Sequence, residues 1–176
     1  MNKTVYTSIE VTPISGALGA LVSGVELKDA LQEEVFAEIY KAFLDYKVIF
    51  FKDQALNPKT QLRFGSMFGQ PIIYPFIKGL KDFPEIIPIL KKETDVNNFG
   101  GVWHSDTTYQ QQPPKATMLY AVEVPDYGGD TEFANQCMAF DHLSDGMQKF
   151  LSKQKIVNTS GKGKVVASRS DVMKHS

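Results

Sequence analysis

The chain has 176 residues, of which 43% are hydrophobic, and a formal net charge of -1. A chain of this size can form one ordinary soluble domain, and its near-neutral charge gives no electrostatic reason to expect nucleic acid or an anionic membrane as a partner. The single cysteine, Cys137, excludes an internal disulfide framework and a cysteine-rich zinc site. The N-terminus lacks the apolar core of a signal peptide, and no apolar run is long enough to span a bilayer, so we expect a cytoplasmic protein.

The first 51 residues contain both alternating and helical patterns. Residues 6–14 alternate loosely and predict a strand that ends near Pro13, and the glycine-rich residues 16–24 predict a turn region. Asp29 is expected to cap a helix. The apolar face of that helix comprises Leu31, Val35, Ile39, Ala42 and Phe43. The β-branched and aromatic residues 48–51 then predict a buried strand.

A second helix is predicted to begin with Asn57 as its N-cap and Pro58 in its first position, and to end near Gly69. Prolines then divide residues 71–90 into short extended pieces. The clearest of these extended pieces is residues 85–90.

The remaining chain predicts two more strands and one more helix. Residues 116–124 and 131–133 read as strands joined by a turn at 126–129, and Ser144 is expected to cap a last helix. From Lys153 basic side chains dominate and apolar ones are few, so residues 153–176 are expected to form a poorly ordered tail rather than a basic recognition surface.

Residues 103–106 read Trp-His-Ser-Asp. If this segment is extended, the side chains of His104 and Asp106 leave the same face of the strand and can bind one metal ion. One imidazole and one carboxylate are two of the three ligands in the facial triad of non-haem Fe(II) oxygenases. Trp103 is expected to form an apolar wall beside the histidine ring. The alternative is a surface pair, or a core histidine satisfied by a neighbouring carboxylate, because a lone His-x-Asp triplet arises by chance in many proteins.

Further motifs surround this triplet in a fixed order. Residues 98–109 read Asn-Phe-Gly-Gly-Val-Trp-His-Ser-Asp-Thr-Thr-Tyr, and Pro113-Pro114 and then Gly128-Gly129-Asp130-Thr131 follow. Together these motifs resemble the iron-binding region of the TauD/TfdA family, the taurine and 2,4-dichlorophenoxyacetate dioxygenases that use Fe(II) and 2-oxoglutarate. The resemblance covers most of residues 5–160. It implies an α+β fold: an incomplete double-stranded β-helix (jelly roll) with flanking helices, in which residues 1–176 form the N-terminal part of a single dioxygenase domain.

The resemblance also implies roles for individual residues. His104 and Asp106 correspond to the first two iron ligands, and Thr131 to a threonine whose hydroxyl binds a carboxylate of 2-oxoglutarate. Tyr74 lies near the position where taurine-specific members place a substrate-contacting histidine, which argues against taurine as the substrate. Asn98 lies in the loop that borders the substrate in relatives. The alternatives are that Thr131, Tyr74 and Asn98 are ordinary strand, packing and turn residues.

The family's third iron ligand, a distal histidine, and the arginine that clamps 2-oxoglutarate have no counterpart in this sequence. His142 is expected to be a structural or surface residue, His175 is the penultimate residue, and Arg169 lies too early to be the clamp. We therefore expect the chain to be a fragment that lacks C-terminal strands and is inactive or incomplete on its own. Its uncovered sheet edges could promote homo-oligomers.

The function expected from the resemblance is that of an Fe(II)- and 2-oxoglutarate-dependent dioxygenase. Its partners would be dioxygen, 2-oxoglutarate and a small organic acid or related substrate that it hydroxylates. A second hypothesis is a truncated, non-catalytic family member that acts as a binding module. A third is a cupin-like jelly-roll binder, which is disfavoured because cupin sites gather more histidines than the three in this chain.

Overall fold

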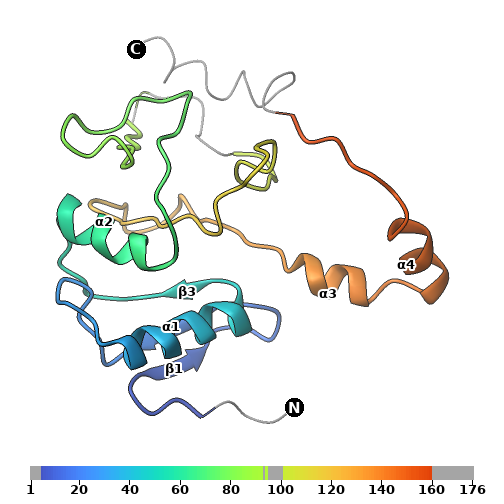
Figure 1. The fold of residues 1–176 in the computed structure, drawn as a ribbon, viewed down its shortest axis with the longest axis horizontal. Coiled ribbons are helices and arrows are strands. Elements are labelled where there is room, and N and C mark those ends of the chain that lie inside the picture. The colour runs from blue at the N-terminus through green and yellow to red at the C-terminus, as the bar shows by residue number, and fades with distance from the viewer. Residues whose placement is uncertain (1–4, 93, 95–100, 160–176) are drawn as a thin grey trace. The chain divides into compact units, whose positions relative to one another are not determined.

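The computed structural model describes residues 5–92, 94 and 101–159 (Figure 1). The chain divides into two compact units. Unit 1 comprises Met1–Thr60 and Tyr120–Lys155, and unit 2 comprises Gln61–Leu119 and Ile156–Ser176. Most of the predicted tail, 153–176, lies outside the described residues. None of the helices in the described part of the chain has the length and apolar character needed to cross a membrane.

A small mixed sheet forms the centre of unit 1. Its strand order is β1-β2-β3, with β1 and β2 antiparallel and β2 and β3 parallel. The register pairs Val11 with Val22 and Ala20 with Ile49. The strands are β1 (Glu10–Pro13), β2 (Ala20–Ser23) and β3 (Ile49–Phe50). Because parallel strands need a long crossover connection, the chain forms a helix between β2 and β3.

The sequence predicted this sheet in part. The strand expected at 6–14 is confirmed for residues 10–13, which form β1. The turn region expected at 16–24 is wrong for its second half, which forms β2; the glycines at 16, 19 and 24 flank β2 rather than interrupt it. The strand expected at 48–51 is confirmed only as the short β3, and Phe50 is 40% exposed rather than buried.

Helix α1 (Glu33–Tyr46) crosses over the sheet (Figure 1). Its N-cap is Gln32, so the expectation that Asp29 caps it is wrong. No side chain caps the first turn, but Glu33 and Glu34 lie there, where negative charge interacts favourably with the helix dipole. The helix ends at Tyr46, and its C-cap, Lys47, has a φ of 68° and an N–H that donates to the Phe43 oxygen at 2.8 Å.

The apolar core of unit 1 lies between α1 and the sheet. Ile39 and Ala42 on α1 are fully buried, as the helical spacing predicted. Ala20 and Val22 are also buried, and because they are two residues apart on β2 they share one face of the sheet. Leu27, in the connection from β2 to α1, is one of the largest fully buried side chains. These contacts hold α1 against the strands.

The carboxylate of Glu38 on α1 binds the segment that leads into β1. It accepts hydrogen bonds from the Thr7 hydroxyl at 2.7 Å, from the Thr7 N–H at 2.8 Å and from the Ser8 N–H at 2.9 Å. The Ile9 N–H adds a fourth at 3.3 Å. All four donors favour the ionised carboxylate, so they hold the pKa of Glu38 below its ordinary value of 4.5, the Thr7 hydroxyl most strongly.

We expect Glu38→Gln to lower the urea midpoint of unfolding at pH 7, because the amide cannot accept from all four donors. A folded-state pKa below the unfolded value stabilises the fold above pH 4.5, and this stabilisation is lost as the pH falls through the folded value. The difference in urea midpoint between wild type and variant should therefore become smaller as the pH is lowered. Circular dichroism during urea titrations at pH 7 and at lower pH measures it, with the exposed Glu123→Gln as a control. An equal difference in urea midpoint at both pH values would show that the ionised carboxylate of Glu38 does not stabilise the fold.

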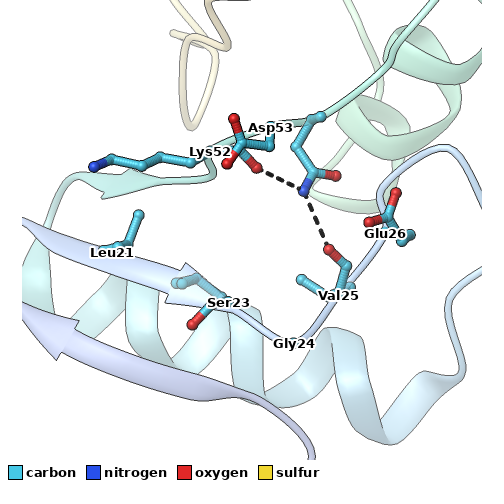
Figure 2. A pocket seen from close by; sticks show the side chains of 9 residues that line it. Leu21, Ser23, Gly24, Val25, Glu26, Lys52 and Asp53 are labelled. Atoms are coloured by element: carbon cyan, nitrogen blue, oxygen red, sulfur yellow. Dashed lines mark hydrogen bonds between the residues drawn. The ribbon is translucent and has the colours of Figure 1, made fainter.

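The side chain of Gln54 connects two loops of unit 1 at the carboxyl ends of β2 and β3. Its Oε1 accepts from the Leu27 N–H at 2.8 Å, and its Nε2 donates to the Val25 oxygen at 3.2 Å and the Lys52 oxygen at 3.0 Å. Figure 2 shows the two amide donations as dashed lines at the edge of a hollow of about 420 Å³. The backbone oxygen of Gln54 also accepts from the Tyr120 hydroxyl at 3.1 Å.

Gln54→Glu should destabilise unit 1 although the two side chains have the same shape. The carboxylate of Glu can still accept from the Leu27 N–H. Its second oxygen, however, replaces the amide group that donates to the Val25 and Lys52 oxygens, and an oxygen cannot donate to them. Leaving such groups unsatisfied costs about 1–3 kcal/mol. The free energy of unfolding from urea titrations measures the effect, and the exposed Gln70→Glu controls for the added charge. If Gln54→Glu lowers the free energy of unfolding no more than Gln70→Glu does, the two hydrogen bonds donated by the Gln54 amide contribute nothing to stability.

Two short helices end unit 1, and both have side-chain caps. Ser144 caps α4 (Asp145–Leu151) by accepting from the Met147 N–H, as predicted. Helix α3 (Gln136–Asp141) was not predicted; its N-cap, Asn135, accepts from Met138 N–H and donates to the Ala17 oxygen at 2.6 Å. Neither helix has a buried residue, so these contacts and their caps define their positions more than core packing does.

Helix α2 (Pro58–Met67) begins as predicted, with the Asn57 side chain accepting from the Thr60 N–H at 3.0 Å. Phe64 is its buried residue and meets Phe68 edge-to-face, with ring centroids 5.5 Å apart. The rest of unit 2, in its described residues, consists of loops and turns.

The strands expected at 116–124 and 131–133 are not formed in this structure. Leu119, Val122 and Val124 are exposed, and neither segment pairs with a strand. An apolar segment of this kind needs a neighbouring strand to satisfy its backbone and cover its side chains. The described residues thus contain helices and a small sheet, without the strands of a double-stranded β-helix.

Candidate metal site

His104 and Asp106 lie in a loop of unit 2 that leads into a turn. The expected strand is absent here: His104 has no regular structure, Asp106 begins the turn, and the Gln110 N–H donates to the Thr107 oxygen at 3.0 Å. Thr107 has a φ of 48°, a left-handed conformation that is rare for a β-branched residue. The two side chains nevertheless converge, with His104 Nε2 3.2 Å from Asp106 Oδ1.

The ring of His104 is oriented by its own backbone. Nδ1 lies 2.7 Å from the Val102 oxygen. A carbonyl oxygen can only accept, so Nδ1 carries the proton of this hydrogen bond. In the neutral imidazole Nε2 is then the nitrogen with a free lone pair, and it is directed toward the carboxylate of Asp106.

The carboxylate of Asp106 is oriented by a residue that sequence reasoning missed. The Thr117 hydroxyl donates to Oδ2 at 2.7 Å, while Oδ1 faces the histidine. Nothing in the spacing or residue type distinguishes Thr117 from an ordinary β-branched residue in a predicted strand. Only the folded loop shows that its hydroxyl meets Asp106.

The stability of the fold does not explain this arrangement. The His104 and Asp106 side chains are 40% and 51% exposed. An exposed ion pair contributes about 0–1 kcal/mol, because water competes with both partners. The imidazole ring and the carboxylate could be solvated separately at little cost, so their defined geometry favours a role in binding.

The geometry fits two positions of a metal site. Neighbouring ligand atoms at about 2.1 Å from an octahedral ion lie about 3 Å apart, close to the separation of Nε2 and Oδ1. An imidazole nitrogen and a carboxylate oxygen are also a donor set that Fe(II) accepts. The hydrogen bonds to Val102 and Thr117 are of the kind that orient metal ligands in proteins. His104 and Asp106 could therefore hold Fe(II) with positions left open for other ligands.

Three comparisons with known proteins indicate one family of dioxygenases. The sequence model described as "Taurine catabolism dioxygenase TauD, TfdA family" matches residues 10–175. The chain is 28% identical to an alkylsulfatase of Acinetobacter baylyi, over 86% of this chain and 47% of that protein. It is 30% identical to an alpha-ketoglutarate-dependent sulfate ester dioxygenase of Pseudomonas putida, over 82% and 48%. A solved taurine dioxygenase from Burkholderia xenovorans has a TM-score of 0.73 at 32% identity, over 84% of this chain and 52% of that one.

The chain belongs to the TauD, TfdA family. This confirms the family that residues 98–131 indicated, and it excludes the cupin-like hypothesis. The chain spans about half the length of the curated relatives it matches.

Three other residues have predicted roles: Thr131, Asn98 and Tyr74. Thr131 belongs to unit 1, where it is exposed and outside any strand, whereas His104 and Asp106 belong to unit 2. Asn98 lies outside the described residues. His142 is exposed at the C-terminal end of α3, also in unit 1. Among the described residues no third histidine, cysteine, aspartate or glutamate joins the pair to form a three-ligand cluster.

Tyr74 belongs to an aromatic row in unit 2. Its ring centroid lies 5.6 Å from that of Phe76, which in turn lies 6.0 Å from that of Tyr109. The hydroxyl oxygen of Tyr109 is buried without a hydrogen-bond partner, an arrangement that a polar group of a ligand could satisfy. Trp103, in contrast, is 69% exposed, and its expected role as an apolar wall beside the ring of His104 stays a prediction.

The orientation of His104 can be tested directly. We expect its neutral imidazole to carry the proton on Nδ1, because only that form donates to the Val102 oxygen. Long-range ¹H–¹⁵N spectra of the ¹⁵N-histidine-labelled chain distinguish the two neutral forms, and His104→Gln identifies the signal among three histidines. The exposed His142 serves as the internal control. A neutral His104 protonated on Nε2 would contradict the metal-binding geometry.

Proposed function

We propose that this chain binds the metal and part of the co-substrate of an Fe(II)- and 2-oxoglutarate-dependent dioxygenase. The observation that carries the proposal is the convergence of His104 Nε2 and Asp106 Oδ1, 3.2 Å apart, within the region that matches the family. The finer fold belongs to the same proposal: residues 1–176 as the N-terminal part of a single jelly-roll dioxygenase domain, whose barrel strands need neighbours beyond the described residues.

The reaction we propose joins two oxidations. Dioxygen gives one oxygen atom to 2-oxoglutarate, which loses carbon dioxide and becomes succinate, and the other to a C–H bond of the substrate, which becomes C–OH. Bound Fe(II) would supply the electrons that make dioxygen reactive. The residues of this chain would bind and orient: His104 and Asp106 would hold the metal and leave its other positions free for the reactants.

Thr131 is proposed to donate its hydroxyl hydrogen to a carboxylate of 2-oxoglutarate. Its side chain is exposed, and a hydroxyl can donate one hydrogen bond to an anion. Tyr74 is proposed as a substrate contact, because it lies in the aromatic row that ends at the buried hydroxyl of Tyr109. The role of Asn98 at the substrate stays a prediction.

The substrate is proposed to be a small organic acid or a related anionic compound. The printed names of relatives include a sulfate ester dioxygenase and a 2,4-dichlorophenoxyacetate dioxygenase. An aromatic row such as Tyr74, Phe76 and Tyr109 suits the apolar part of such a molecule, since flat rings bury area at low entropic cost.

A second candidate function is a non-catalytic binding module, and one observation favours it. Only two protein ligands for the metal come from the described residues. Two ligands bind Fe(II) weakly, since Fe(II) is near the weak end of the divalent series. The two functions differ in whether the metal and 2-oxoglutarate bind together at His104.

The deciding experiment is anaerobic addition of Fe(II) and then 2-oxoglutarate to the full chain. We expect a visible charge-transfer band that requires both additions, because 2-oxoglutarate would bind the metal beside His104 and Asp106. The band should disappear in His104→Gln and persist in His142→Gln, which removes an exposed histidine far along the chain. Succinate formation after admission of air measures turnover, which we expect to be slow or absent with two protein ligands.

The outcomes separate the two functions. A band lost in His104→Gln supports the dioxygenase site, and sustained succinate formation would strengthen that conclusion while refuting the expectation that this chain is incomplete by itself. No band, together with no change in the His104 signals on metal addition, would overturn the dioxygenase proposal for this chain and leave the binding module.

A further inference from the structure

The two oxygens of Asp106 have different partners. Oδ1 faces Nε2 of His104 at 3.2 Å, and Oδ2 accepts from the Thr117 hydroxyl at 2.7 Å. All three residues belong to unit 2, so the arrangement does not depend on how the two units are placed. The hydroxyl fixes the rotation of the carboxylate and thereby determines which oxygen is presented toward the histidine.

A carboxylate can bind a metal ion through one oxygen or through both. Two-oxygen binding would fill a coordination position that a dioxygenase needs for its co-substrate or for dioxygen. A short hydrogen bond to Oδ2 disfavours it, because Oδ2 would have to give up or bend a charge-assisted bond to approach the metal. Hydrogen bonds to a ligating carboxylate commonly control its orientation in this way.

Packing gives no other reason for this contact. Thr117, Asp106 and His104 are exposed, so the hydroxyl and the carboxylate could both bind water instead. A surface hydrogen bond of this kind adds little to the stability of the fold. Its effect is on the direction of the carboxylate.

We propose that Thr117 is a positioning residue that keeps Asp106 a one-oxygen metal ligand. The proposal rests on the proposed function, because it requires that His104 and Asp106 bind a metal. Thr117 touches neither metal nor substrate in this account. It acts through Asp106, and it leaves the remaining positions around the metal open.

The test compares Thr117→Val, which keeps the shape but removes the hydroxyl, with Thr117→Ser, which keeps the hydroxyl but removes the methyl. Thr12→Val, at an exposed position of β1 in unit 1, is the matched control. Co(II) is the probe, since it replaces Fe(II) in oxygen and nitrogen sites and does not oxidise in air. Its binding is followed by paramagnetic changes in the ¹⁵N-histidine signal of His104, and circular dichroism verifies that each variant is folded.

We expect Thr117→Val to weaken Co(II) binding at His104 by about 10-fold or more, the usual consequence of losing a hydrogen bond that orients a ligand. Thr117→Ser and Thr12→Val should bind as the wild type does. The visible absorption of bound Co(II), which depends on how many ligands surround the ion, should change in Thr117→Val alone. A purely structural role for Thr117 would alter the melting temperature without changing this spectrum.

Three results would overturn the proposal. Equal affinity and an equal spectrum in wild type and Thr117→Val would overturn it while leaving the metal site intact. Equal weakening in Thr117→Val and Thr117→Ser would assign the effect to packing of the methyl group. No Co(II) effect on His104 in the wild type would overturn both this inference and the proposed function, so the wild-type titration distinguishes the two failures.

Discussion

The hydrogen bond between Nδ1 of His104 and the backbone oxygen of Val102 determines what the candidate site can bind. With the proton held on Nδ1, the neutral ring directs a lone pair at a carboxylate oxygen 3.2 Å away. Two lone pairs that face one another repel unless a proton or a cation lies between them. The proton gives a common surface ion pair, and the cation gives a metal site. The same contacts thus serve both states, and the metal competes with a proton for Nε2.

The site and the core of the fold depend on different parts of the chain. Residues 102–117 supply the hydrogen bonds that orient His104 and Asp106 in the described part of the chain. The buried side chains of unit 1 come instead from the sheet, from the residue before β1, from α1 and from the connection between β2 and α1. Because the contacts of the site join exposed residues that are close together in the sequence, they can form and open locally without unfolding the core. Binding of a metal would then order a loop that packing alone leaves weakly constrained.

Features that depend on neighbouring residues could be predicted from the sequence. The caps at Asn57 and Ser144 are local hydrogen bonds, and the spacing of Ile39 and Ala42 sets one face of α1. Strand β2 was missed because glycines surround it, and its strand character comes from pairing with β1 and β3. The segment 116–124 shows the converse: a run of apolar residues is a local pattern, but a strand needs a partner elsewhere.

The pair His104 and Asp106 was predicted to converge from a strand, and it converges from a turn. In a strand, spacing of two residues is sufficient to place both side chains on one face. In this loop Asp106 is followed by Thr107 at a φ of 48°, and the Thr107 hydroxyl is buried without a partner. A strained non-glycine residue and an unsatisfied hydroxyl each cost about 1–3 kcal/mol.

Glycine or asparagine would adopt the backbone conformation of Thr107 with less strain, so local preference does not explain the turn. The feature that the turn does produce is the direction of the Asp106 carboxylate, between Thr117 on one oxygen and His104 on the other. Strain beside two converging ligand atoms is therefore an independent physical reason to regard this loop as the functional part of the chain.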